Sequence, residues 1–435
     1  MLTLLETMPI NNCVLSNGIR LITEPIVATK AVAIGFWFSS GSRDEGEGEF
    51  GITHYAEHLL FKGSDSQSAF DIARFFDRIG GYVNAFTERE MVCVHCCIPG
   101  MYTEEALEVL IHMIWNASFH ENDIEVERSV IISEILASQD DPDEMGMDRA
   151  ISLIYPGNAY SRPIAGTEAD IMSLSAEKLR EFYELRFKNI RPLVSIAGNF
   201  NSITAKAKIS RISFDRTDNS PLPENNKLLW QPGVFFPRSV FKQSQVYLSY
   251  PMTGGRTSRD WFSWAIINAI IGDTVSSRLN QSLRERKGLC YSVFSFFVFN
   301  RDSAFWMAAT NVPPEKTYET VDTLLSEIDE IRKINFNRRE FDEAKTHLIG
   351  ELLLSEEDTE NRMKRLARQF FLNGSVFDID GFIQTLNEIG FNEVNLLLKD
   401  SLIDTKRSLV LYTGKKESRE IEKKWKSNFL PKRAL

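Results

Sequence analysis

The sequence His54-Tyr-Ala-Glu57-His58 is the strongest constraint on how this chain can fold. Residues four apart on an α-helix project from the same face, one turn apart, so the two imidazoles become neighbours only if this segment is helical. Glu57 follows His54 by three residues and shares that face. The flanks favour a short helix, because Gly51 precedes the motif and Gly63 follows it as a stop signal.

The spacing H-x-x-E-H inverts the H-E-x-x-H motif found on the metal-binding helix of zinc peptidases. Two imidazole nitrogens one turn apart can bind one zinc ion, and the carboxylate beside them can reach a water on the metal. The alternative is a surface helix that happens to carry two histidines. Against it, the chain has only six histidines. Leu59 and Leu60 also predict a buried helix, in which imidazoles need partners.

A third ligand is predicted further along the chain, because catalytic zinc usually has three protein ligands and one water. Glu127 and Glu134 lie seven residues apart in a predicted helix over 123–138, and therefore share a face. Acids on a partly buried stripe are costly unless they are used. The alternative is a solvated acidic face. The core side of this helix is assigned to Ile124, Val130, Ile131 and Ile135.

The composition is that of a globular protein, with 435 residues of which 43% are hydrophobic and 25% charged. The net charge of −10 argues against a nucleic-acid partner. The longest apolar run, 31–38, is too short to span a bilayer. The five cysteines form no disulfide framework, and residues 1–12 show no signal-like pattern. We therefore expect a reducing, cytoplasmic location.

The stretch Cys93-Val-His95-Cys96-Cys97 has the residue types of a metal cluster, but its composition predicts a strand over 91–98. Neighbouring side chains in a strand point to opposite faces, so these four groups cannot converge on one ion. We interpret the cysteines as small packing residues.

The predicted elements recur in the same order in two halves, 1–214 and 232–435, separated by a polar linker over 215–231. Each half has a strand, a helix, a strand pair and another helix, so we predict an α+β fold with two similar halves. The second-half helix over 265–271 has no His or Glu, so only the first half can hold a metal in this way. The elements are predicted over 30–39, the motif helix, 82–98 and 103–115, and again over 245–251, 261–271, 288–311 and 313–333.

Four separated motifs together resemble the M16 family of zinc metallopeptidases, which includes mitochondrial processing peptidase, insulin-degrading enzyme and small bacterial processing proteases. The likeness covers essentially the whole chain. A His-Pro pair common in the family reads Asn158-Ala159 here, in a segment that is not catalytic. The motifs are His54-x-x-Glu57-His58 with Glu134 76 residues after His58, Glu127-Arg128-Ser-Val-Ile-Ile-Ser-Glu134-Ile135, Gly80-Gly81-Tyr-Val-Asn84-Ala85-Phe-Thr87, and Ser277-Arg278-Leu279…Leu283-Arg284-Glu285-x-x-Gly288-Leu289-x-Tyr291-Ser292.

The resemblance implies a role for each residue of the metal site. His54, His58 and Glu134 would bind one zinc ion per chain, and Glu57 would be the general base. Glu127 would orient a ligand from outside the first coordination shell, and a surface position is the alternative for it.

The resemblance also implies substrate-binding residues. Asn84 and Ala85 resemble the family's edge strand, to which a peptide adds as a further strand. The alternative is a plain turn and strand start. Arg284 and Tyr291 resemble a pair that the second half contributes to the substrate and the oxyanion. Their alternative is a surface arginine and a packed tyrosine.

For the whole chain, the resemblance implies a clamshell of two homologous halves, each with two similar α+β units of mostly antiparallel sheet flanked by helices. The implied activity is that of a zinc-dependent endopeptidase acting on extended or unfolded peptides inside a closed chamber. Family members of this length pair as homodimers or with a related subunit. The alternatives are a non-catalytic M16-like subunit and a purely structural metal site, in which Glu57 would have no purpose.

Overall fold

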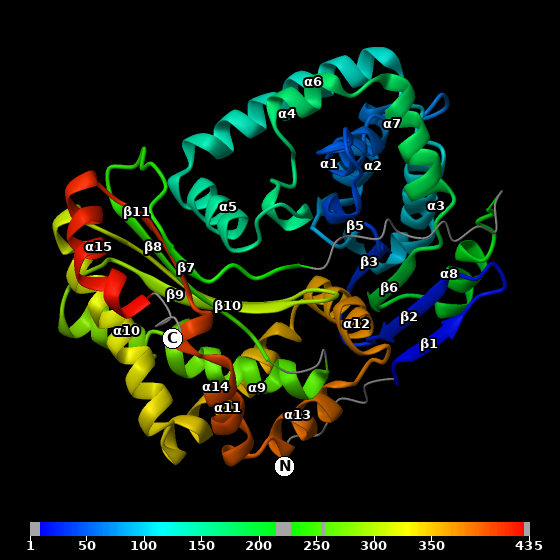
Figure 1. The fold of residues 1–435 in the computed structure, drawn as a ribbon. Coiled ribbons are helices and arrows are strands. Elements are labelled where there is room, and N and C mark those ends of the chain that lie inside the picture. Colours follow the sequence, from blue (N-terminus) through cyan, green and yellow to red (C-terminus); the bar gives the residue numbers. More distant parts are fainter. Residues whose placement is uncertain (1–8, 215–227, 254–256, 430–435) are drawn as a thin grey trace. The chain divides into compact units, whose positions relative to one another are not determined.

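The computed structural model describes residues 9–214, 228–253 and 257–429, and internal contacts divide the chain into two compact units. Most of the predicted linker, 215–231, lies outside the described residues. Among the described residues, unit 1 consists of 9–139, 162–214 and 353–379, and unit 2 consists of 140–161, 228–253, 257–352 and 380–429. Figure 1 shows the elements of both units.

Unit 1 contains a six-stranded mixed sheet in the order β1-β2-β6-β3-β5-β4. Only β2 and β6 run parallel, and all other neighbours are antiparallel. Strand β4 is therefore an edge strand, paired only with β5 among the described residues. The strands are β1 (Asn11–Val14), β2 (Arg20–Pro25), β3 (Ala31–Phe38), β4 (Tyr82–Thr87), β5 (Val92–Pro99) and β6 (Leu193–Gly198).

Helices cover both faces of this sheet. One face carries the main core of unit 1. On the other face, a smaller core forms between the sheet and α12. Val130, predicted on the core side of α4, is instead exposed, because it lies about 100° around the helix from the buried Ile131. The helices are α1 (Ile52–Leu60), α2 (Ala69–Ile79), α3 (Thr103–Trp115), α4 (Glu121–Asp140), α6 (Glu168–Ser173), α7 (Ala176–Tyr183), α8 (Ser202–Ile209) and α12 (Thr359–Asn373).

Unit 2 contains a five-stranded sheet in the order β7-β11-β8-β10-β9, in which only β7 and β11 run parallel. Its larger core involves α9, α10 and α14, while α5 packs on the opposite face. The elements are β7 (Gly233–Phe235), β8 (Ser244–Pro251), β9 (Val293–Phe299), β10 (Ala304–Val312), β11 (Ser408–Tyr412), α5 (Pro142–Ile154), α9 (Ser258–Asn268), α10 (Thr317–Ile334), α11 (Arg338–Ser355), α13 (Ile379–Glu388), α14 (Phe391–Ser401) and α15 (Lys415–Phe429).

The two sheets repeat one topology, because the order β6-β3-β5-β4 in unit 1 corresponds to β11-β8-β10-β9 in unit 2. The predicted α+β fold with two similar halves is confirmed. The expected subdivision of each half into two similar units is wrong, since each unit holds a single sheet among the described residues. Helices on both faces already bury that sheet, so it needs no second one to pack against.

The compact units also exchange segments relative to the linear halves. Helix α5 comes from the first half of the chain but packs with unit 2, and α12 comes from the second half but packs with unit 1. The reason is burial of apolar faces: Ile151 and Ile154 of α5 join the core beside Tyr247, whereas Met363 and Leu366 of α12 join the core beside Trp37. None of the described helices is both long and apolar enough to cross a membrane.

Candidate metal centre

A glycine, Gly51, directly precedes helix α1, because neighbouring backbone leaves no room for a side chain at that position. Gly51 has φ +81°, and a Cβ atom there would lie 2.5 Å from the carbonyl oxygen of Ala165. Gly51 has no side chain to cap the helix, and the carboxylate of Glu45 does so instead. It accepts hydrogen bonds from the backbone N–H of Gly51 (2.9 Å) and of Thr53 (3.0 Å). The helix start is therefore held from outside the helix.

The rest of α1 is buried as the sequence predicts, with Ile52, Tyr55, Leu59 and Leu60 fully enclosed in the core of unit 1. Burial of these residues leaves the opposite stripe of the helix as the only one that can meet solvent. This stripe carries His54, Glu57 and His58.

His54, His58 and Glu134 are brought together by α1 and α4. One ligand atom from each lies within 4.8 Å of the others, and this is the only such group of three or more His, Cys, Asp or Glu side chains among the described residues. Nε2 of His54 lies 3.7 Å from Oε1 of Glu134, and Nε2 of His58 lies 3.5 Å from Oε2. Glu134 is half exposed, so the group opens to solvent on one side.

These distances suit a shared zinc ion better than direct pairing. They exceed the usual length of a hydrogen bond between nitrogen and oxygen. Ligands bound tetrahedrally to zinc at about 2.1 Å lie about 3.4 Å from one another. Two imidazoles and one carboxylate with an open side form the donor set of a catalytic zinc site, so the residues present fit that metal.

Burial keeps His54 in the form that binds a metal. Burial lowers the pKa of His54 to about 4, and the neighbouring His58 acts in the same direction. His54 is therefore neutral at neutral pH, and its Nδ1 is buried without a hydrogen-bond partner among the described residues. A neutral imidazole is the form that ligates a metal.

Glu127 lies behind His58. Its Oε2 is 2.9 Å from Nδ1 of His58, and its other carboxylate oxygen pairs with Lys62. Glu127 is only 5% exposed, which does not match a solvated acidic face. Because a carboxylate accepts from Nδ1–H, His58 presents its Nε2 towards Glu134. Lys62 is a further residue of the site that none of the motifs includes, and its spacing of four residues from His58 is the signal for it.

Glu57 is buried beside the histidines and is held by strand β4. The hydroxyl of Thr87 donates a hydrogen bond of 2.5 Å to its Oε2. Burial raises the pKa of Glu57 above its ordinary 4.5, the hydrogen bond from Thr87 and the proximity of His58 act to lower it, and Glu134 acts to raise it. Thr87 ends the motif over residues 80–87, which gives it no role of its own. Because side chains alternate along a strand, Thr87 is expected on the same face of β4 as Ala85.

Asn84 and Ala85 lie on the edge strand, opposite His95 and Val94 of β5 respectively. The Asn84 side chain is exposed, and its Oδ1 accepts a hydrogen bond of 2.9 Å from the Ala85 N–H. The position of both residues on an unpaired strand edge agrees with the geometry that strand addition requires.

Arg284 and Tyr291 both belong to unit 2, whereas the metal-site residues belong to unit 1. Arg284 lies on a π-helical segment, Asn280–Arg286, and its guanidinium carbon is 5.7 Å from the centre of the Tyr291 ring. Tyr291 is 88% exposed, so it is not the packed tyrosine of the alternative interpretation. The structure thus pairs these two residues with each other.

Within the part of the chain that the structure describes, no cysteine belongs to a group that could hold a metal ion. All five are free thiols, and Cys93 and Cys96 are fully buried on opposite faces of the sheet, in two different cores. Burial raises the pKa of both thiols. The interpretation of these residues as packing residues agrees with this placement.

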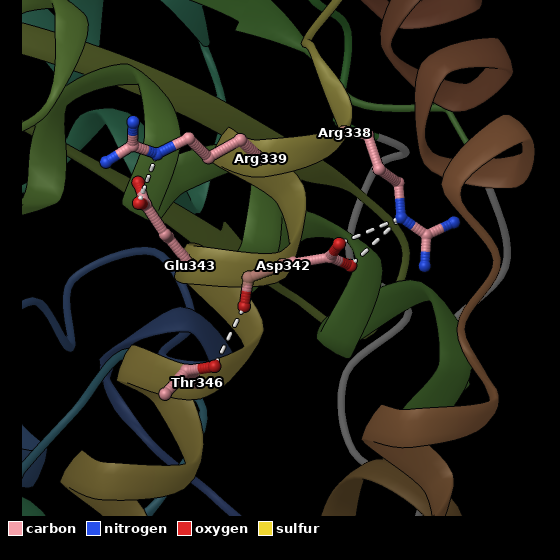
Figure 2. Close-up of a pocket in the computed structure, with 5 residues that line it drawn as sticks. All are labelled: Arg338, Arg339, Asp342, Glu343 and Thr346. Carbon is pink, nitrogen blue, oxygen red and sulfur yellow. Dashed lines mark hydrogen bonds and ion pairs between the residues drawn. The ribbon is translucent and has the colours of Figure 1, made fainter.

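A shallow hollow on α11 also has charged walls. Figure 2 shows that two ion pairs line it, Arg338 with Asp342 and Arg339 with Glu343, beside Thr346. The partners in each pair are one helical turn apart. These charges satisfy one another on an exposed helix surface, so the hollow lacks the free donors of a catalytic site.

Comparison with known proteins agrees with this fold and with zinc as the metal. The insulinase model of peptidase family M16 matches residues 20–168, and the model of the peptidase M16 inactive domain matches residues 173–348. Together they span both halves, and only the first contains the metal-binding group. The chain therefore belongs to the M16 peptidase family.

Curated relatives support the same assignment, and a solved structure supports the fold. An uncharacterized zinc protease of Bacillus subtilis, YmxG, is 29% identical over 88% of this chain and 93% of its own length. An uncharacterized zinc protease of Streptomyces coelicolor is 28% identical over 89% of this chain and 86% of its own. The crystal structure of a protease from Helicobacter pylori has a TM-score of 0.84 at 18% identity, covering 93% of this chain and 99% of that one. The last similarity shows the fold.

Proposed function

We propose that this chain is a zinc-dependent endopeptidase that hydrolyses extended or unfolded peptides. The observation that carries the proposal is the convergence of His54, His58 and Glu134 on one point, with the carboxylate of Glu57 beside them. A site built only to stabilise the fold would need no additional carboxylate that does not ligate the metal, and no open side. The names of the relatives support zinc as the metal.

His54, His58 and Glu134 would hold the zinc ion. When bound, zinc acts as a Lewis acid towards the scissile carbonyl and lowers the pKa of a water. Glu57 takes a proton from the attacking water and returns it to the leaving amine. Thr87 fixes the Glu57 carboxylate through its hydrogen bond, and Glu127 fixes the His58 ring.

The free edge of β4 is the proposed peptide site. A substrate strand lying along Asn84 and Ala85 would gain backbone hydrogen bonds at every second residue of β4, without a strict sequence requirement. Because an added strand can run past both ends of β4, a free peptide terminus is not needed, which favours internal cleavage. Arg284 and Tyr291 are proposed to hydrogen-bond the oxyanion, as the family resemblance implies.

The same proposal includes cleavage in an enclosed chamber and pairing with a second copy or a related subunit, as the resemblance implies for members of this length. It also includes a cytoplasmic location, which the five free cysteines support.

Cleavage of a pool of unstructured peptides tests the proposal. Purified wild type and Glu57→Gln are compared, with products identified by mass spectrometry and bound zinc measured by elemental analysis. We expect cleavage by wild type only, with equal zinc in both proteins. Cleavage by Glu57→Gln near the wild-type rate would remove Glu57 as the base. Zinc bound but no cleavage by either protein would favour the non-catalytic subunit.

A further inference from the structure

The two faces of strand β4 have different partners. Val83, Ala85 and Thr87 alternate along the face that packs on the main core of unit 1 and reaches Glu57. Tyr82 and Phe86 lie on the opposite face, where Phe86 joins the core that contains α12. An edge strand has a hydrogen-bonded neighbour on one side only, so these face contacts decide how firmly it is held.

Helix α12 is anchored to the sheet by a separate set of residues. Met363, Leu366 and Ala367 are fully buried against it. Arg362 and Arg365 each place a guanidinium nitrogen 2.9 Å from the buried carboxylate of Glu24 on β2. These contacts lie towards β2, β3 and β6, away from the edge strand, so they hold α12 in place whether or not it contacts β4.

A second stripe of α12 points at β4. Glu360, Lys364 and Arg368 follow one another at intervals of four residues, so they form a ridge along one side of the helix. Glu360 accepts a hydrogen bond from the Tyr82 hydroxyl. Nζ of Lys364 lies 5.5 Å from the centre of the Phe86 ring. The ridge therefore meets the first residue and the next-to-last residue of the strand.

The last residue of the ridge contacts the end of the strand. Nη2 of Arg368 lies 2.5 Å from Oε1 of Glu88, which directly follows Thr87. The ridge thus contacts β4 near both of its ends and the residue that follows it, next to the residue that holds Glu57.

Two side chains of the ridge also form an ion pair with each other. Nζ of Lys364 lies 2.5 Å from Oε1 of Glu360. Burial acts to raise the pKa of Glu360, but the hydrogen bonds from Lys364 and Tyr82 outweigh it and hold that pKa below its ordinary value. Glu360 is therefore ionised at neutral pH and remains an acceptor for the Tyr82 hydroxyl.

We propose that Glu360, Lys364 and Arg368 of α12 are positioning residues that hold the edge strand β4 in the conformation to which a peptide substrate adds. The inference rests on the proposed peptidase function and deepens it. A strand that is already ordered loses less conformational entropy when a substrate pairs with it, so the ridge acts on substrate affinity and not on the chemistry.

The test uses the triple variant Glu360→Gln, Lys364→Met, Arg368→Gln in the full chain. Removing one negative and two positive charges changes the formal net charge by −1, as does the control Arg339→Gln on α11. We measure hydrogen exchange of the β4 amides. We also measure the Kd of a fluorescein-labelled unstructured peptide for the zinc-loaded protein in the Glu57→Gln background. In the wild-type background we measure kcat and KM. Thermal unfolding reports whether α12 stays docked.

We expect faster exchange in residues 82–87 but not in α1. Kd and KM should rise about tenfold, because a free strand must order one or two more residues when it binds the peptide. The kcat should stay within twofold of wild type. Arg339→Gln should change none of these. Unchanged exchange in β4, or faster exchange with an unchanged Kd, would overturn the inference. A wild type that cleaves nothing would overturn the proposed peptidase function, while exchange and peptide Kd would still decide whether the ridge positions β4.

Discussion

Side chains at the metal centre differ in exposure according to the task proposed for each. Glu57 and Glu127 are buried, and each is held by a hydrogen bond from a neighbouring side chain. Glu134 is half exposed. A carboxylate with one fixed orientation suits a base or an orienting group, whereas a ligand on the open side leaves room for water and substrate.

Removing the third ligand should release the metal. In Glu134→Gln, a neutral amide replaces the only carboxylate ligand, so we expect zinc affinity to fall at least about 100-fold. Competition with a chelator measures it. Glu121→Gln, at the exposed start of the same helix, is the control and should bind zinc normally. Full zinc occupancy in Glu134→Gln would show that the third ligand lies elsewhere.

Freeing the general base should slow turnover without releasing zinc. Thr87→Val keeps the shape of the side chain and its preference for a strand but removes the hydrogen bond to Glu57. We expect kcat to fall roughly tenfold, the effect of one hydrogen bond to a charged group. Thr346→Val on α11, where the hydroxyl bonds only a helix carbonyl, is the matched control. An unchanged kcat would mean that Glu57 is held by other contacts.

At the scale of elements, α1 and α12 owe their positions to residues outside their own apolar patterns. The start of α1 depends on the space available at Gly51 and on the carboxylate of Glu45. Helix α12 depends on the sheet it covers, because its buried residues pack with β2, β3 and β6 of the other half of the chain.

A methyl group at the start of the metal-binding helix should be destabilising. Gly51→Ala combines a positive φ with a clash against the Ala165 carbonyl, so we expect a loss of about 1–3 kcal/mol. Gly350→Ala in α11 is the matched control, since nothing lies within 4 Å of the added carbon. That change should stabilise the protein slightly by favouring helix. Equal unfolding temperatures for the two variants would contradict this explanation.

At the scale of the whole molecule, each compact unit takes one helix from the opposite half of the sequence. The chain passes from unit 2 into unit 1 before α12 and returns after it. Neither half of the sequence therefore contains all the residues that close its own sheet.

The first half alone should expose apolar surface. A fragment of residues 1–214 lacks α12, which leaves the sheet face around Ile22, Trp37 and Leu193 uncovered. We expect it to bind the dye ANS and to unfold at lower urea than the full chain. A synthetic peptide of residues 353–379 should reduce the dye signal. Absence of dye binding in the fragment would contradict the assigned role of α12.

The second half should contribute to turnover but not to metal binding. Arg284→Ala is expected to lower kcat about 10- to 100-fold, the effect of one donor to an oxyanion, with zinc content unchanged. Arg286→Ala is the matched control, because Arg286 lies on the same segment and is mostly exposed. An unchanged rate in Arg284→Ala would remove this residue from catalysis.

Local patterns account for most of what could be predicted. The helix predicted over 103–115 is α3 (Thr103–Trp115), and the motif helix is α1. Both signals are short-range: helical periodicity with a glycine at the end, and ligand types at a fixed spacing. The repeated order of strands and helices along the two halves is a signal of the same local kind.

Spacing along a helix fixes which side chains share a face, so the sequence indicates that His54 and His58 can bind one zinc ion. The family resemblance adds Glu134 as the third ligand, and the repeated order of elements indicates the class of fold. The folded chain alone establishes that Thr87 holds Glu57, that Lys62 pairs with Glu127, and that α12 lies behind the edge strand. These contacts join residues far apart in sequence, and packing of apolar faces, which have no unique partner in the sequence, selects them.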